Sequence, residues 1–182
     1  MGLTFISSQT ASSDSSLDFT SGIDSTYNEY LFTIVNYKPV TDESKLGFQV
    51  DTGTNTSYGQ TITSTSWKAG HAEDDGWSVL SYNGDEDQAQ GTALQRISYS
   101  GESGSNEMTS SGTLTLYAPS DGTYVKHFTA RVNTQYQSGS DKYAIDNFVG
   151  GYVNTTTALT RVRFATTSGN ILTGTFALYG VS

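Results

Sequence analysis

Histidines, serines and carboxylates are the side chains of this sequence that hydrolytic chemistry would use. The chain has two histidines, His71 and His127, and 25 serines, but no serine stands in a G-x-S-x-G turn. Its 18 carboxylates include no local pair whose spacing singles out the acid and base of a glycosidase. We therefore expect a protein without enzyme activity, and a polysaccharide depolymerase ranks third among three functions considered.

Two acidic clusters, at residues 73–75 and 85–87, offer the oxygen ligands that calcium prefers. Neither has the D-x-[DN]-x-[DN]-G spacing of an EF-hand, and adjacent carboxylates in a loop usually form a solvated edge. The chain has no cysteine, which excludes disulfides and thiolate metal sites. We expect no metal and no cofactor, with calcium at Asp85, Glu86 and Asp87 as the alternative.

Aromatic residues make up 12% of the chain, and an exposed group of them would form a surface on which sugar rings stack. Aromatic residues on strands more often belong to the core or to cross-strand pairs. Carbohydrate binding is therefore an alternative function. Its candidate stacking residues are Tyr58, Trp67, Trp77, Tyr82 and Tyr99.

The chain is acidic, and its charge is unevenly distributed. The net charge of −9 has the wrong sign for neutralising phosphates, which excludes nucleic acid as a main partner. Residues 123–182 nevertheless carry five basic and two acidic side chains. If these basic residues share one side of the domain, that side would dock on an acidic neighbour; otherwise they lie on ordinary strand faces. The candidate docking residues are Lys126, Arg131, Lys142, Arg161 and Arg163.

The elements that must position these residues are β-strands. The chain has 25 Ser and 27 Thr, many aromatic residues, and turn signals along its whole length. Evenly spaced strands without helical periods predict an all-β protein, an antiparallel β-sandwich of jelly-roll type that forms a single domain over residues 1–182. Alternation predicts about ten to twelve strands, at residues 3–8, 16–20, 30–37, 45–51, 61–67, 77–82, 93–99, 112–117, 124–136, 148–153, 159–165 and 171–179.

Three local patterns carry further expectations. Apolar side chains point to both faces of the strand at residues 30–37, which predicts cover on both sides, and Phe5 is assigned to the core. Gly150 and Gly151 interrupt a strand pattern and predict a bulge or a close backbone contact. Residues 67–80 are ambiguous between a short helical turn and an acidic loop.

No stretch of the sequence approaches the roughly 20 apolar residues that cross a bilayer. The first residues also lack the basic and apolar regions of a signal peptide. We therefore expect a protein that is soluble as made and has no membrane partner.

Seven segments of the sequence carry a resemblance to a known group of proteins: residues 19–32, 39–42, 69–75, 125–128, 150–156, 168–171 and 174–180. Together they resemble small virion structural proteins of tailed bacteriophages, particularly phages of aquatic bacteria. The last two segments, a Ser-Gly-Asn turn and the strand after it that ends in Leu-Tyr-Gly, are similar to the C-terminus of many capsid-decoration and fibre-associated domains. The resemblance extends over most of the chain. It implies a non-enzymatic β-sandwich that is made in the bacterial host cytoplasm and located on the virion surface.

Our preferred hypothesis is an auxiliary capsid or decoration protein that associates with itself, as a trimer at threefold positions, and docks on the major capsid protein or another virion protein. The alternative is a tail-fibre or receptor-binding domain that recognises host surface glycans. The two hypotheses predict different surfaces. A glycan-binding protein needs a solvent-facing Tyr or Trp platform at a loop end, whereas a decoration protein needs a flat face for self-association and a docking face.

Overall fold

The computed structural model describes residues 2–101 and 107–182, and these residues form twelve strands and no helix. The expected all-β protein is therefore confirmed, and the described residues include no helix that could span a membrane. The strands are β1 (Leu3–Asp14), β2 (Ser16–Phe19), β3 (Glu29–Pro39), β4 (Leu46–Thr52), β5 (Ile62–Ala72), β6 (Ser78–Tyr82), β7 (Gln95–Arg96), β8 (Ser110–Tyr117), β9 (Lys126–Ser138), β10 (Asp141–Val153), β11 (Leu159–Thr166) and β12 (Ile171–Val181).

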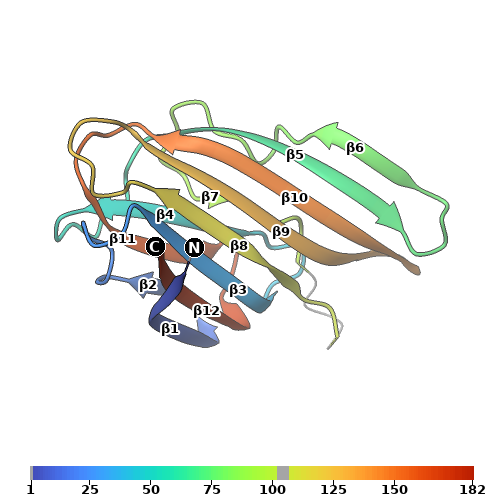
Figure 1. Ribbon diagram of the computed structural model, residues 1–182. Helices are drawn as coiled ribbons and strands as arrows, with labels where there is room; N and C mark the ends of the chain where they lie inside the picture. The colour runs from blue at the N-terminus through green and yellow to red at the C-terminus, as the bar shows by residue number, and fades with distance from the viewer. Residues whose placement is uncertain (1, 102–106) are drawn as a thin grey trace.

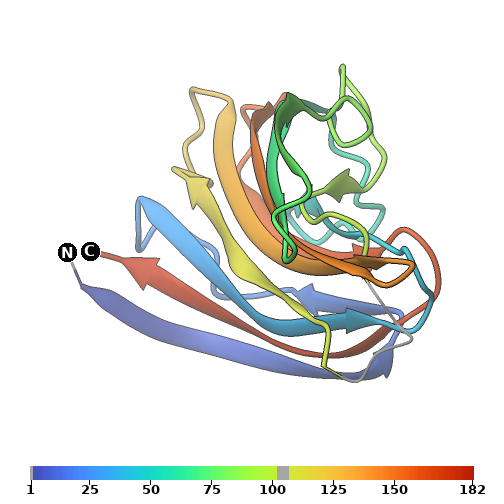
Figure 2. The same ribbon diagram turned by 90° about the vertical axis from the view of Figure 1, so that its right-hand side faces the viewer.

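The strands form two sheets in which every pair is antiparallel. The large sheet has the order β1-β12-β3-β8-β9-β10-β5-β6, and the small sheet has the order β2-β11-β4-β7. The pairing is nested, because β1 pairs with β12, β2 with β11, β3 with β8, and β4 with β7. Figures 1 and 2 show the large sheet curving from β1 at the bottom to β5 and β6 at the top.

The core lies between the two sheets, and its centre is aromatic. Phe19 and Phe164 of the small sheet meet Phe32 and Phe176 of the large sheet, with ring centroids between 5.0 and 6.1 Å apart. Most of these rings meet edge to face, a geometry that adds about 0.5–1.5 kcal/mol per pair beyond simple burial. We call the face of the large sheet that packs on this core the inner face, and the opposite face the outer face.

Two expectations about the core are wrong, because the small sheet covers only the inner face. Phe32 is fully buried on the inner face of β3, whereas Val35 on the outer face is 48% exposed, so this strand is covered on one side within the chain. Phe5 lies opposite Tyr179 on the outer face and is 58% exposed. Alternation places side chains on two faces, but it does not tell which face another sheet covers.

Gly151 marks a close contact, and the bulge alternative is wrong. The register of β10 with β5 and β9 is continuous through Gly150 and Gly151. A Cβ on Gly151 would lie 2.5 Å from the carbonyl oxygen of Thr63 and 2.9 Å from the ring of Phe128. A residue without a side chain therefore lets β5 and β10 pair over the core at this point.

The ambiguous segment at residues 67–80 is mostly strand. β5 continues to Ala72, and β6 returns along β5 with Trp67 opposite Tyr82. Only residues 73–76 form an acidic turn, in which the amide of Gly76 donates to Asp74 at 2.9 Å. This hairpin carries the large sheet past the small one, which leaves part of its inner face without a facing strand.

Candidate functional site

A cleft of about 260 Å³ lies on the inner face at the β5–β6 end of the large sheet. Four aromatic side chains form its walls, one from the residue before β6, one from the segment after β7, and two from the β9–β10 hairpin. The described residues that line it are Trp77, Tyr99, Tyr136, Ser138, Tyr143 and Ile145. None of them is a carboxylate or a histidine, so these side chains offer stacking and hydroxyl groups for binding.

The four rings contact one another, and two of their three contacts are edge to face. Trp77 meets Tyr143 at 5.4 Å and 90°, and Tyr99 meets Tyr136 at 5.2 Å and 87°. Tyr136 and Tyr143, which pair directly across the β9–β10 hairpin, are 6.0 Å apart and join the two pairs into one cluster. Contacts between rings restrict their rotamers, so the cleft has a defined shape before any ligand arrives.

Gly70 on β5 allows the Trp77 ring to lie close against the backbone of the sheet. A Cβ at this position would lie 2.6 Å from the Trp77 ring. The amide of Ala72 donates to the carbonyl of Trp77 at 2.8 Å, which fixes the backbone at the other side of the acidic turn. Trp77 remains 39% exposed, and its indole is therefore open to solvent along the cleft.

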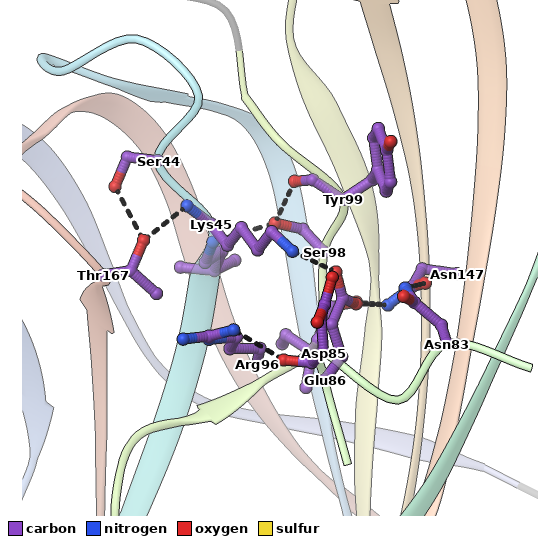
Figure 3. A network of polar contacts seen from close by, with 12 residues as sticks. Ser44, Lys45, Asn83, Asp85, Glu86, Arg96, Ser98, Tyr99, Asn147 and Thr167 are labelled. Atoms are coloured by element: carbon purple, nitrogen blue, oxygen red, sulfur yellow. Dashed lines mark hydrogen bonds and ion pairs between the residues drawn. The ribbon is translucent and has the colours of Figure 1, made fainter.

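Tyr99 reaches the cleft from a long loop that a buried polar network holds against both sheets (Figure 3). The carboxylate of Glu86 is fully buried and pairs with the ammonium of Lys45 at 2.9 Å. Asn147 on β10 donates to the same carboxylate, and Gln95 donates to the carbonyl of Glu86 at 2.7 Å. This network anchors the loop at residues 83–101, because the buried carboxylate has a cation and an amide as partners.

Cations also lie against the ring of Tyr99. The ammonium of Lys68 is 4.4 Å from its centroid, and that of Lys45 is 5.8 Å away. On the other side of the cleft, partial burial raises the pKa of Tyr143, and neighbouring Asp141 acts in the same direction. The hydroxyl of Tyr143 is therefore protonated at neutral pH.

The acidic loop at residues 85–87 is occupied by contacts within the chain. Glu86 is held by Lys45 and Asn147, and Asp87 accepts a hydrogen bond from the hydroxyl of Tyr82. Among the described residues, no three His, Asp or Glu side chains are grouped as a metal ion would need. The calcium alternative therefore has no support in the arrangement of this loop.

Two of the predicted stacking residues, Trp67 and Tyr82, lie together on the outer face. The Trp67 ring stacks on the Phe148 ring, with centroids 3.9 Å apart and an angle of 6° between the planes. The guanidinium of Arg131 lies 4.7 Å from the centroid of the Phe148 ring. Trp67, Leu80 and Tyr82 border a shallow hollow of about 360 Å³. These four predicted residues are thus divided between the two faces of the large sheet, with Trp67 and Tyr82 on the outer face and Trp77 and Tyr99 in the cleft on the inner face.

Tyr58 does not fit the prediction of sugar stacking. Its side chain is 1% exposed, and the guanidinium of Arg163 lies 4.0 Å from its ring centroid. The cause is Asp51, a buried carboxylate that accepts hydrogen bonds from the amide of Tyr58 at 2.7 Å and from Gln60 at 3.1 Å. These bonds fold the loop after β4 back onto the small sheet, so Tyr58 has a structural position.

Asp51 also makes stability depend on pH. Burial raises the pKa of Asp51, but hydrogen bonds from Thr52, Tyr58 and Gln60 outweigh burial, so its pKa lies below the usual value. Its contribution to stability is therefore present above the pKa of an unfolded Asp, about 3.9, and is lost as the pH falls through the lower pKa of the folded protein. We expect Asp51→Asn to destabilise the protein at neutral pH and to differ less from wild type in acid.

Urea unfolding of both proteins between about pH 7 and pH 2 measures this difference. Asp75→Asn, at a side chain that is 92% exposed, is the control and should follow wild type throughout. A difference between Asp51→Asn and wild type that stays constant over the whole range would contradict the expectation.

The five predicted docking residues do not form one surface. Lys126 is fully buried and donates to the carbonyl of Tyr124 at 2.6 Å, and burial lowers its pKa. Its assignment to a docking surface is wrong, because its place in β9 points into the core. Lys142 pairs with Glu107 at 3.1 Å near the tip of the β9–β10 hairpin.

The three arginines lie on opposite sides of the molecule. Arg131 is on the outer face of the large sheet and pairs with Asp146 at 2.6 Å. Arg161 and Arg163 are on β11 of the small sheet, where Arg163 pairs with Asp18 at 2.8 Å and Arg161 donates to the carbonyl of Gly53 at 3.2 Å. The interpretation that these residues lie on ordinary strand faces fits this placement.

Sequence reasoning missed Tyr136 and Tyr143, which complete the cleft. Tyr136 lies two residues before Ser138 and Tyr143 lies two residues after Asp141, so the two tyrosines stand opposite each other once Ser138 and Asp141 pair across the turn. The histidines take no part in the cleft: His71 pairs with Asp75 at 3.1 Å, and His127 lies 6.2 Å from the ring of Tyr152.

Comparisons with known proteins add no relatives: no family model matches the chain, and neither a curated protein nor a solved structure matches it significantly. The resemblance to phage virion proteins therefore stays an expectation. What the protein does must follow from its own side chains.

Proposed function

We propose that the protein is a virion surface domain that binds host surface saccharides, and that the aromatic cleft is its binding site. The observation that carries this proposal is the cluster of Trp77, Tyr99, Tyr136 and Tyr143 around an open cleft at one end of the sheet. Two of these residues belong to the set expected for a glycan-binding protein. A cleft with aromatic walls and a few polar groups is the usual form of a small-molecule site.

Saccharides suit this cleft better than other small molecules do. A pyranose ring presents C–H groups on its faces, which pack on aromatic rings, and hydroxyl groups around its edge, which need hydrogen-bond partners. Hydroxyl groups from three tyrosines and Ser138 stand among the lining residues. Because tyrosine and tryptophan combine an apolar body with a polar tip, these side chains can serve both requirements at once.

The preferred decoration hypothesis loses part of its basis. Its docking surface required basic side chains on one side, but Lys126 is buried and the arginines lie on both sheets, paired or bonded to the backbone. The glycan-binding alternative gains a defined cleft. We therefore propose receptor recognition as the role on the virion, and binding without catalysis, because the described lining residues include no acid or base pair.

We further propose that the fold is a jelly roll with two inserted hairpin elements. Without β5, β6, β9 and β10, the sheets have the orders β1-β12-β3-β8 and β2-β11-β4-β7, with four strands in each. In a jelly roll, eight strands form two four-stranded sheets, and the first strand pairs with the last, the second with the one before the last, and so on inward. The insertions extend one sheet only, and they supply every described lining residue of the cleft except Tyr99.

Saccharide binding is testable with a matched pair of tryptophan variants. The chain has two tryptophans, Trp67 on the outer face and Trp77 in the cleft. A saccharide that binds on an array of bacterial oligosaccharides is then titrated calorimetrically into each variant. We expect Trp77→Ala to weaken binding by about tenfold or more, which corresponds to about 1.4 kcal/mol, while Trp67→Ala binds like wild type.

Tyr143→Ala serves as the second cleft variant, and circular dichroism confirms that each variant is folded. Absence of any bound saccharide on the array would overturn the proposed function. Loss of binding in Trp67→Ala with full binding in Trp77→Ala would move the site to the outer face, and would also contradict the assignment of the cleft.

A further inference from the structure

The outer face of the β1, β12, β3 and β8 half of the large sheet is apolar and nearly without charge. The apolar side chains that point outward there are Leu3, Phe5, Leu31, Val35, Tyr179 and Val181. Phe5, Tyr179 and Leu31 lie directly opposite one another and form a row across three strands. Phe5 packs edge-on against Tyr179 at 5.7 Å. The remaining outward positions of these rows are mostly threonine and serine. We call this surface the uncharged face.

Charged side chains are present on the other exposed sheet surfaces. Arg131 and Asp146 stand on the outer face of the other half of the large sheet, and Asp18, Arg161 and Arg163 stand on the small sheet. The uncharged face extends from Leu3 to Thr10 of β1 and over the residues that pair with this stretch on β12, β3 and β8. Among its outward-facing residues, Glu29 at one end is the sole charged one. Solvated sheet faces normally carry polar and charged residues, so a face of this kind indicates a contact surface.

The charge of the chain indicates what covers this face. With a net charge of −9, two copies of the chain repel each other wherever acidic surfaces meet. The uncharged face is a place where two copies can approach without that cost. An anionic lipid surface is disfavoured, because the face has no Lys or Arg to attract it and the whole chain is acidic.

The size of the face is of the order that an interface needs. Four strands at about 4.8 Å spacing and about eight residues at about 3.4 Å each span roughly 500 Å² of flat area, to which side-chain relief adds. A standard interface buries about 800 Å² of accessible surface on each partner. Burial of exposed phenylalanine, leucine and valine side chains stabilises such a contact by roughly 25 cal/mol per Å² of apolar surface, before the cost of association.

We propose that the uncharged face is the surface through which copies of this chain associate. The edge strand β1 borders this face, and its free edge of 12 residues is the longest strand edge of the two sheets. No charged or proline residue precedes Asp14 in β1, so most of that edge lacks the side chains that commonly block strand pairing, and association would cover both the face and the edge. If the uncharged faces of two copies pack against each other, the assembly is a dimer. If the uncharged face of one copy packs against a different side of the next copy, the assembly is a ring such as the expected trimer.

The experiment is light scattering on the whole chain at roughly 100 µM, a concentration at which a micromolar dissociation constant gives mostly oligomer. Wild type is expected at two or three times the 19.5 kDa mass of the chain. The double variant Phe5→Glu with Val35→Glu is expected to be monomeric, because it places carboxylates in the contact. Both side chains are about half exposed in the single chain, so the variant should still fold.

The control is Leu80→Glu, at an apolar side chain that is 73% exposed on β6, outside the uncharged face. It should keep the mass of wild type. Thr175→Arg, at an exposed threonine of the uncharged face, tests the same contact if the double variant does not fold. A monomeric wild type, or an unchanged mass in every folded variant of the face, would overturn the proposal. These readouts do not depend on saccharide binding.

Discussion

Replacing Lys45 by alanine is expected to lower the free energy of unfolding by about 3 kcal/mol, one of the largest single effects in this protein. The substitution removes the cation at 2.9 Å from Glu86, whose carboxylate is fully buried. Removal of the lysine leaves the buried carboxylate with the Asn147 amide but without a counter-ion, and this penalty exceeds the net value of the intact ion pair. Urea unfolding of Lys45→Ala and wild type at neutral pH measures the loss.

Lys142→Ala is the matched control, because Lys142 also pairs with a glutamate, Glu107, at 3.1 Å. That pair is largely exposed on the glutamate side, and its loss should cost less than about 1 kcal/mol. If both lysine variants lose the same stability, burial of Glu86 does not govern the effect, and the account of the loop network is wrong.

Phe164→Ala is expected to lose about 3–5 kcal/mol, because its ring fills the centre of the core. The ring has aromatic neighbours on three strands, Phe19 at 6.1 Å, Phe32 at 5.3 Å and Phe176 at 5.0 Å. Their positions on both sheets prevent a simple collapse into the space that the substitution leaves. Thermal and urea unfolding give the change in stability.

Tyr124→Ala removes an aromatic ring that is 70% exposed and serves as the control for Phe164→Ala. We expect a change within about 0.5 kcal/mol for it. A loss below about 1.5 kcal/mol in Phe164→Ala would mean that the two sheets can move together to fill the cavity.

Much of the strand content follows from local alternation, whereas the sheet arrangement does not. The strand predicted at residues 112–117 differs from β8 (Ser110–Tyr117) by two residues, because turn residues bracket it closely. β10 begins at Asp141, seven residues before its prediction, because residues 141–147 form a strand through pairing with β9 and β5. Partition into sheets of eight and four strands depends on distant partners, which local periodicity cannot identify.

The candidate site was also only partly predictable, because residue type is local information whereas burial depends on distant partners. Trp77 and Tyr99 could be proposed from residue type, because tryptophan and tyrosine are the side chains on which sugar rings stack. Tyr58 has the same type, but a hydrogen bond from its own amide to Asp51 buries it. Lys126 and Phe5 contradict the usual burial of their residue types, because the lysine is buried and the phenylalanine is exposed. The reason is that the small sheet covers only part of one face of the large sheet.

The nested pairing has a consequence for synthesis of the chain. Strand β12 lies between β1 and β3, so a strand made late must pair between two strands that are made early. At a synthesis rate of about 5–20 residues per second, roughly 10 to 30 s pass between the synthesis of β1 and that of its partner β12. Pairs this distant in sequence also form slowly. During that interval the nascent chain can assemble β8, β9 and β10 first, and β1 and β12 join together as the closing step.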